Sequence, residues 1–519
     1  MDKIVTAAQM RAAEERTERA GTPTARLMQN AGAAAARVIA EALAQGREGD
    51  AERGGRQARV LVLCGPGNNG GDGMVVARRL AEWGHQVAAY TVGRDEPFPS
   101  RPLVVRHADD PDLVALRRML ADATVVVDAL LGTGRARPIE GDLAAILDLV
   151  RPLAASRAVV ALDLPSGVDA DTGAADPHTV PATITITFGL YKRGLVVGPG
   201  AALAGHVSLA PIGLDLHAAD DVLLWRAGEE DARARIPARS SDANKYSAGA
   251  VLVVAGSRRF TGAPQLATMG AARAGAGLVT LATGASTHPI LASHLLEPTF
   301  LILKDDEDGV LDPTAAVAAI KEMASRYKAL LFGPGLAQGD ATARLLETLL
   351  CEDTLPGGLP MVVDAEGLNA LATIDRWSTR ALHPLTLTPH TGEMARLAGS
   401  NHAEIDERRL DIAPRKAREW GVTLVLKGNP TVTAAPDGTA AVNTTGGPNL
   451  ATGGTGDVLG GVIAALIAQG AAPFDAAVAG VYLHGRAGDV LAERDGDRGT
   501  LAGDLPPVIP RVIKRVLSD

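Results

Sequence analysis

The stretch from residue 60 to residue 73 decides the fold of the first part of the chain. An apolar run, Val60-Leu61-Val62-Leu63-Cys64, is followed by Gly65-Pro66-Gly67-Asn68-Asn69-Gly70-Gly71-Asp72-Gly73, and a helical pattern comes next. A buried strand that turns through glycines into a helix is typical of parallel α/β sheets, and backbone N–H groups at such a turn can bind a pyrophosphate. The loop lacks the G-x-G-x-x-G dinucleotide fingerprint, and a tight structural turn is the alternative interpretation.

Strand and helix patterns alternate along the rest of the chain, which predicts two α/β units with mainly parallel sheets. The charged, weakly periodic segment 215–239 separates them, and we place the boundary near residue 228, giving domains 1–228 and 229–519. A hairpin is predicted around Pro436-Asp437-Gly438. Strands are predicted at 60–64, 123–128, 158–163 and 183–188 in the first unit and at 250–254, 278–282, 329–332, 360–363, 385–388 and 421–426 in the second.

Composition excludes several classes of protein. The 519 residues carry 51 basic and 60 acidic side chains, a net charge of −9, and no basic run that would bind nucleic acid. The two cysteines, Cys64 and Cys351, form neither a disulfide framework nor a zinc site, so we expect a cytoplasmic protein. The N-terminus lacks an export signal, and Thr6 can cap a first helix. The apolar region 458–483 is interrupted by polar residues and proline, which predicts two buried helices and no membrane span.

Polar residues follow three strands of the first unit. Asn69 follows the first, Asp128 ends the second, Asp163 ends the third, and Ser166 follows it. The carboxyl ends of parallel strands face one crevice, so we expect these side chains to converge there. A cap or turn role is the alternative for each of them taken singly.

With the Gly132-Thr133-Gly134 loop, Phe188-Gly189 and Lys192, these motifs resemble the NAD(P)H-hydrate epimerase family over about residues 1–215. The resemblance implies a Rossmann-like, doubly wound domain in which Asp163 is the acid/base residue. It also implies a K⁺ ion held by Asn69, Asp128 and Ser166. The implied contacts to the hydrated nucleotide are Asn68, Asn69, Gly70, Gly71, Asp72, Gly132, Thr133, Gly134, Arg135, Ala136, Arg137, Pro138 and Asp163.

In the second unit, Gly453-Gly454-Thr455-Gly456-Asp457 precedes an apolar helix. Amides at a helix start can stabilise a transferring phosphoryl group, and Asp457 can take a proton from the attacking hydroxyl. Asp457 as a helix cap is the alternative. Lys427 stands at a glycine turn, which suggests a phosphate contact, but this position alone is equally compatible with a surface lysine. His390 taken alone is more typical of a structural histidine.

These segments resemble the ribokinase-like NAD(P)H-hydrate dehydratase family over about residues 235–510. The resemblance implies Ala263, Gly335, His390 and Asp457 at the hydrate, and Lys427, Gly428, Asn429, Pro430, Thr431 and Gly456 at the adenine nucleotide. The chain departs from the family at Asn244, Thr391, Asn429 and Pro430. Pro430 has no backbone N–H, which puts in doubt a phosphate contact by that amide.

The two resemblances together imply a bacterial bifunctional repair enzyme, both an isomerase and a lyase. Its substrates would be NADHX and NADPHX, the forms of NADH and NADPH that carry water across a nicotinamide double bond. It would interconvert their R and S forms and dehydrate the S form to NADH or NADPH with ADP and Mg²⁺, giving AMP and phosphate. The use of ADP is implied by the resemblance to bacterial enzymes in which the epimerase and the dehydratase are fused in one chain. No particular residue indicates it. We also expect a homo-oligomer, although no residue pattern defines its interface. The alternatives are a small-molecule alcohol kinase fused to a nucleotide-binding module, and a non-catalytic first unit.

Overall fold

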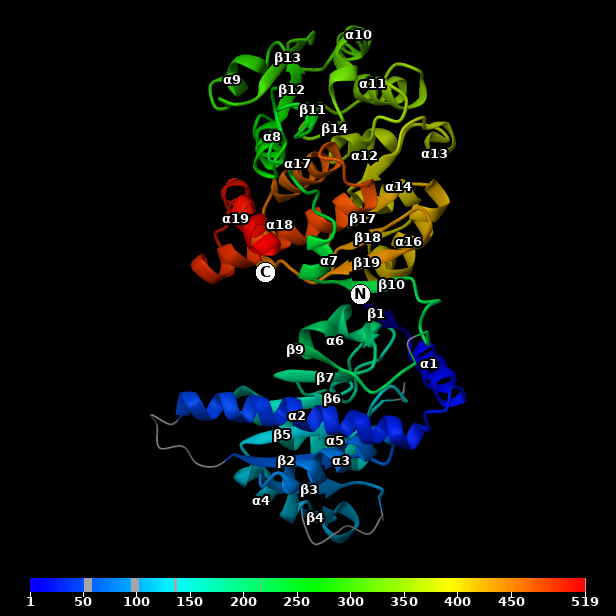
Figure 1. Cartoon of the computed structure of the whole chain (residues 1–519), viewed down its shortest axis with the longest axis vertical. Coiled ribbons are helices and arrows are strands. Elements are labelled where there is room, and N and C mark those ends of the chain that lie inside the picture. The colour runs from blue at the N-terminus through cyan, green and yellow to red at the C-terminus, as the bar shows by residue number, and fades with distance from the viewer. Residues whose placement is uncertain (51–57, 95–101, 135–137, 216, 519) are drawn as a thin grey trace. The chain divides into compact units, whose positions relative to one another are not determined.

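The contacts of the chain divide it into two compact units, residues Asp2–Val222 and Leu223–Asp519, with Met1 grouped with the second unit. Each unit is a separate α/β body (Figure 1). The computed structural model describes residues 1–50, 58–94, 102–134, 138–215 and 217–518, with no side chains described for 45–50.

Among the described residues of the first unit, seven parallel strands form one sheet in the order β4-β3-β2-β5-β6-β7-β9. The chain runs outward from β2 through β3 to β4 and then returns to the other side of β2 as β5. Ligands of doubly wound sheets bind at this point of reversal. The bounds are β2 (Arg59–Cys64), β3 (Gln86–Thr91), β4 (Leu103–Arg106), β5 (Val125–Ala129), β6 (Ala158–Leu162), β7 (Ile184–Phe188) and β9 (His206–Ala210).

Helices cover both faces of this sheet because side chains of β2 alternate between them. Val60 and Val62 pack with residues of α2 and α3, whereas Leu61 and Leu63 pack with residues of α4 and α5. Thr6 caps α1 as predicted and forms a capping box with Gln9. A short strand β1 (Asp2–Val5) pairs in parallel with β8 (Tyr191–Lys192). The helices are α1 (Ala7–Arg19), α2 (Thr24–Asp50), α3 (Asn68–Glu82), α4 (Val114–Asp122), α5 (Gly141–Val150) and α6 (Gly198–Leu203).

The sheet of the second unit runs in the order β13-β12-β11-β14-β15-β16-β17-β18-β19-β10. Its strands are parallel through β17, the predicted hairpin β18–β19 is antiparallel, and β10 is parallel to β19. The bounds are β10 (Leu224–Ala227), β11 (Ala250–Val254), β12 (Leu278–Gly284), β13 (Thr299–Leu303), β14 (Ala329–Phe332), β15 (Met361–Val363), β16 (Leu385–Leu387), β17 (Thr423–Leu426), β18 (Val432–Ala434) and β19 (Ala440–Asn443).

Helix α17 (Thr455–Ala468) lies in the core of this unit and is buried from Val458 to Ala468. It packs closely on α8 (Gly262–Arg273), because a Cβ on Gly461 would lie 2.0 Å from the carbonyl oxygen of Ala267. The other helices are α7 (Glu229–Arg233), α9 (His288–Ala292), α10 (Pro313–Met323), α11 (Asp340–Cys351), α12 (Glu366–Leu371), α13 (Trp377–Arg380), α14 (Thr391–Ala398), α15 (His402–Glu407), α16 (Arg409–Trp420), α18 (Pro473–Asp495) and α19 (Leu505–Ser518).

The predicted architecture of two α/β units is confirmed, as are the hairpin and the two apolar helices α17 and α18. Within the described residues no helix is long and apolar enough to cross a membrane. The predicted strands correspond to β2, β5, β6, β7, β11, β12, β14, β15, β16 and β17, whereas β1, β3, β4, β8, β9, β10 and β13 were not predicted.

Two glycines of the loop after β2 allow close packing of the backbone, a role that the sequence analysis did not assign to them. A Cβ on Gly65 would lie 1.8 Å from the carbonyl oxygen of Leu130, and one on Gly70 would lie 1.9 Å from that of Gly65. Gly67, in contrast, has no such atom within 4 Å. The loop therefore brings β2, α3 and the end of β5 together at the reversal point of the sheet.

We predict that Gly70→Ala destabilises the first unit by about 3 kcal/mol, the upper end of the usual cost of overpacking, because the new methyl group meets backbone. Hydrogen–deuterium exchange of peptides from β2 and α3 measures the loss. Gly67→Ala is the matched control and should leave protection unchanged. Equal protection in the two variants would contradict the assigned packing role.

Candidate active sites

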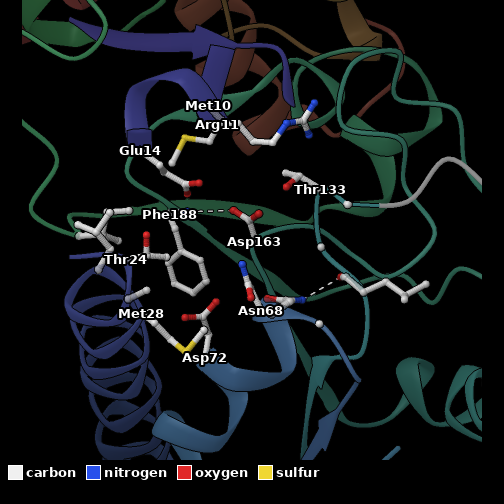
Figure 2. A pocket seen from close by; sticks show the side chains of 18 of the residues that line it. Met10, Arg11, Glu14, Thr24, Met28, Asn68, Asp72, Thr133, Asp163 and Phe188 are labelled. Atoms are coloured by element: carbon white, nitrogen blue, oxygen red, sulfur yellow. Dashed lines mark hydrogen bonds between the residues drawn. The ribbon is translucent and has the colours of Figure 1, made fainter. Parts of the chain in front are cut away.

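A cavity of about 440 Å³ opens at the carboxyl ends of the strands of the first unit (Figure 2). It brings together Asn69 and Asp163, two of the four residues that the strand-end argument predicted to converge, whereas Asp128 and Ser166 do not line it. Asn68, Asp72 and the 132–134 loop, which the resemblance implied, also line it. Its lining consists of Met10, Arg11, Glu14, Thr24, Leu27, Met28, Ala31, Pro66, Gly67, Asn68, Asn69, Asp72, Leu130, Leu131, Gly132, Thr133, Gly134, Asp163, Phe188, Lys192 and Ile212.

Asp163 is held in one orientation at the end of β6. Its backbone φ is +66°, a left-handed value that residues other than glycine rarely adopt. Its Oδ1 accepts hydrogen bonds from Lys192 Nζ at 2.5 Å and from the Phe188 amide and the Thr187 hydroxyl, both at 3.3 Å. Because all three donors use Oδ1, Oδ2 is the oxygen left for a ligand. Lys192 is 1% exposed and is further bound by Thr187 and the Phe188 carbonyl.

Asp128, Ser166 and Asn69 form a buried polar cluster next to this cavity. The Asp128 carboxyl group accepts hydrogen bonds from the Ser166 amide at 2.8 Å and from the Ser166 hydroxyl at 2.6 Å. Burial raises the pKa of this carboxyl group. Asn69 Nδ2 donates to the carbonyls of Leu131 and Leu162, at 2.8 and 3.0 Å. Asn69 Oδ1 is buried and has no hydrogen-bond partner in the described part of the chain. Asn69 and Ser166 both hydrogen-bond to Leu131, and their oxygens with the buried Asp128 carboxyl group are of the ligand type that hard cations prefer.

Three lining residues of α1, Met10, Arg11 and Glu14, were absent from the sequence prediction. No motif marks them, and only the packing of α1 places them at the cavity. Burial, followed by the nearby negative charge of Asp163, raises the pKa of both Glu14 and Asp72, against the opposing effect of Lys192. The cavity thus holds carboxyl groups that retain a proton more readily than usual.

Some predicted contacts of the first unit lie elsewhere. Gly70 and Gly71 are buried in the first turn of α3 and do not line the cavity, because α3 begins at Asn68. Pro138 is exposed and also lies off the lining. Arg135, Ala136 and Arg137 lie outside the described residues.

The second unit contains a cavity of about 600 Å³ at the start of α17. It brings together His390, the loop 427–431, Gly456 and Asp457, which are distant in sequence. The lining consists of Asp364, Ala365, His390, Glu393, Lys427, Gly428, Asn429, Pro430, Thr431, Asn443, Thr444, Thr445, Gly446, Gly447, Pro448, Leu450, Ala451, Thr452, Gly454, Thr455, Gly456, Asp457, Leu459, Val481, His484 and Gly485.

Ala263 and Gly335 are not brought into this lining. They lie beside each other, because a Cβ on Gly335 would be 3.0 Å from that of Ala263. Ala263 is in the first turn of α8, and Gly335 follows β14. The departure at Thr391 is accommodated, since its hydroxyl donates to Asp406 at 2.9 Å. The carbonyl of Pro430 accepts a hydrogen bond from the buried Arg409 at 2.7 Å, which braces the 427–431 loop.

Lys427 makes an ion pair that the sequence did not predict. Its Nζ donates to Asp364 Oδ1 at 2.8 Å and lies 4.0 Å from Glu393 Oε2. Asp364 is fully buried, and its Oδ2 has no hydrogen-bond partner among the described residues. Asp364 follows β15, so the strand-end argument applied to the first unit would have found it.

Asp457 lies in the first turn of α17, facing this pair. Burial and the negative charge of Asp364 raise its pKa to about 7, against the opposing effect of Lys427. Burial likewise raises the pKa of Glu393 to about 7. Asp457 therefore changes its charge near neutral pH, where a general base is most effective.

Two histidines line the cavity in neutral form. His390 caps α14, and its Nδ1 accepts the Gly392 amide at 2.9 Å, which leaves Nε2 to carry the proton. Burial and Lys427 lower the pKa of His390. His484, which the sequence did not single out, lies 2.9 Å from the Thr455 carbonyl through Nε2, and burial lowers its pKa to about 4.

Comparison with known proteins identifies the family. Residues 251–511 match a family model described as NAD(P)H-hydrate dehydratase, and residues 24–194 match one described as YjeF-related protein N-terminus. The bifunctional NAD(P)H-hydrate repair enzyme Nnr of Moorella thermoacetica is 41% identical over 477 residues, which cover 88% of each chain. The chain belongs to the bifunctional NAD(P)H-hydrate repair enzyme family. The Nnr protein of Escherichia coli K12 is 34% identical and covers 88% of this chain and 86% of its own.

Among solved structures, the ADP/ATP-dependent NAD(P)H-hydrate dehydratase of Bacillus subtilis, crystallised with ATP and Mg²⁺, is 33% identical, with a TM-score of 0.48. It covers 56% of this chain and 98% of its own. In this repair-enzyme chain the first family match begins at residue 24, so α1 and Glu14 lie outside it.

We predict that Asp457→Asn stabilises the second unit at pH 8 and has little effect near pH 4. The folded-state pKa of about 7 lies above the ordinary 3.8, so folding disfavours the ionised carboxylate and stability falls as pH rises between these values. At pH 8 the gain should be on the order of 2–4 kcal/mol, because one pKa unit corresponds to about 1.4 kcal/mol.

Urea unfolding followed by fluorescence of Trp225, Trp377 and Trp420, all in this unit, measures the effect. Asp308→Asn changes an exposed carboxyl and is the matched control. A stability gain that does not depend on pH would contradict the assigned pKa of Asp457.

Proposed function

We propose that the chain repairs hydrated NADH and NADPH in two steps. The first unit would interconvert the R and S forms of NAD(P)HX, and the second would dehydrate the S form with ADP, giving NAD(P)H, AMP and phosphate. The observation that carries the proposal is the match over most of both chains to relatives named as bifunctional repair enzymes. Each unit adds a cavity lined by residues that such chemistry requires.

The first reaction needs an acid/base group at the hydroxyl on C6 of the hydrated nicotinamide ring. Because C6 is bonded to the ring nitrogen, loss of that hydroxyl as water leaves an iminium ion, and water can add again to either face. Asp163 is proposed as such a group, since Lys192 and two further donors hold Oδ1 and leave Oδ2 to the ligand. General acid–base help contributes roughly 10²–10⁴-fold.

The second reaction turns the C6 hydroxyl into a leaving group. Asp457 would take the hydroxyl proton while the oxygen attacks the terminal phosphorus of ADP and the bond to AMP breaks. Phosphate then leaves C6, and loss of a C5 proton restores the dihydronicotinamide. Amides at the start of α17 face the transferring group, and Lys427 balances its charge.

Two cations are part of this proposal. Mg²⁺ binds mainly through nucleotide phosphates and one or two carboxylates, and it neutralises phosphate charge when bound. Asp364 and Glu393 supply carboxylate oxygens in the second cavity, and the unpartnered Asp364 Oδ2 fits that role. K⁺ would be held by Asn69, Asp128 and Ser166, which the unpartnered Asn69 Oδ1 supports, and would brace the loops that carry them.

We predict that the wild-type protein, with ADP and Mg²⁺, restores the full near-ultraviolet dihydronicotinamide absorbance of a mixed R and S hydrate of NADH. Asp457→Ala should restore none, because the hydroxyl loses its base. Asp163→Ala should show a fast phase limited to the S fraction. Consumption of nucleotide by the wild type without recovery of absorbance would instead support an alcohol kinase.

We predict that epimerisation depends on K⁺ and that dehydration of pure S hydrate does not. Replacing K⁺ with Li⁺ should slow epimerisation at least about tenfold, because the smaller ion does not reach ligands spaced for K⁺, and Asn69→Ala should remove the dependence. The measurement is R-to-S conversion by chromatography in buffers matched for ionic strength. Equal epimerisation rates in the two salts would refute the cation assignment.

A further inference from the structure

This inference concerns the epimerisation step and rests on the proposed function of the first unit. Inversion at C6 requires that water leave one face of the ring and that water add to the other. The departing hydroxyl needs a proton donor on its own face, and the incoming water needs a proton acceptor on the opposite face. Inversion of a ring held in one orientation therefore needs two acid–base groups, one on each face.

Asp163 can serve only one of these faces. Its backbone is in a left-handed conformation, and three donors from one side fix its Oδ1, so the carboxylate cannot swing around a bound ring. Lys192 Nζ donates to Asp163 Oδ1 at 2.5 Å, which leaves Oδ2 as the oxygen that can accept a proton in the cavity.

Glu14 enters the same cavity from α1, on a different wall from Asp163 (Figure 2). Its carboxyl group makes no hydrogen bond with any described residue, so both oxygens are available to a ligand. The charged groups that act on it are Lys192, Asp163 and Arg11, and Asp72 interacts with it from α3. Burial raises its pKa, which suits a proton donor.

We propose that Glu14 is the second acid–base group of the first unit and acts on the ring face opposite Asp163. Protonated Glu14 gives its proton to the C6 hydroxyl, the C6–O bond breaks with its electron pair on oxygen, and water departs. A water molecule on the other face then adds its oxygen to C6 and gives a proton to the Asp163 carboxylate. The products are the inverted hydrate, ionised Glu14 and protonated Asp163, and solvent resets the two protons.

Asp72 is the competing carboxyl group in this cavity. It is 8% exposed and lies in the first turn of α3, beside Met28 and below Phe188 in Figure 2. Glu14 is less deeply buried, so it exchanges its proton with water more readily, as each turnover demands. Asp72→Asn therefore belongs in the same experiment.

The test follows two events in oxygen-18 water with the full-length protein and one purified epimer at a time. Chromatography measures inversion and mass spectrometry measures label incorporation, each after subtraction of the protein-free rate. We expect Glu14→Gln to lower inversion at least about 100-fold, within the usual contribution of a general acid. Glu14→Asp should recover part of the rate, and the exposed neighbour Glu15→Gln should match the wild type.

Label incorporation separates a chemical role from a structural one. Asp163→Asn should invert neither epimer, yet it should exchange label into one of them, because Glu14 can release water and return it on its own face. Adding Glu14→Gln should abolish this exchange. Inversion in Glu14→Gln within twofold of the wild type would overturn the proposal, as would exchange that persists in the double variant or depends on Asp72. A wild-type protein that inverts neither epimer would instead refute the proposed function.

Discussion

A buried lysine surrounded by more carboxyl groups than it can neutralise is the constraint on which each site depends. Lys192 and Lys427 are largely buried, and each is bound to one aspartate within 3 Å. A buried charge is stable only when it is paired, so each lysine holds its partner aspartate in place. The other carboxyl groups have no such direct partner, and burial destabilises their charged form. The carboxyl groups are Glu14, Asp72 and Asp163 in the first unit and Asp364, Glu393 and Asp457 in the second.

This excess of carboxyl groups is a source of acid–base function. When several carboxyls share one cation in a poorly solvated cavity, they cannot all ionise, and the pKa of those without a direct partner rises. Burial is the largest cause for Glu14, Asp72, Glu393 and Asp457, and neighbouring carboxylates add to it. Each unit thereby places a lysine-paired aspartate beside a carboxyl group whose pKa is raised, an arrangement that suits proton transfer.

Site residues in the loops that follow strands could be predicted from the sequence. Site residues that reach a cavity only through the packing of a helix could not. Asp128 and Ser166 are hydrogen-bonded to each other, and Asn69 bonds to Leu131 and Leu162 at the same strand ends. Parallel strands end at one edge of the sheet, a rule that needs only the strand positions. Glu14 belongs to a helix that no motif connects to the sheet, so its sequence neighbours hold no signal of its role. Strand β3 was missed because Gln86–Thr91 contains alanines in place of a β-branched run, and its pairing with β2 overrides that weak propensity.

Helix α17 shows how packing in the second unit reaches the chemistry of its site. Gly460 and Gly461 allow close packing on two sides of the helix. A Cβ on Gly460 would lie 3.2 Å from Asp364 Oδ2, and a Cβ on Gly461 would lie 2.0 Å from a carbonyl oxygen of α8. The helix is therefore seated against the end of β15 and against α8. Asp457 lies one turn before Gly460 on the same side, so this seating sets its distance from Asp364 and Lys427, the charges that together with burial determine its pKa. A larger residue at Gly460 would act on the base through its electrostatic surroundings without touching a ligand.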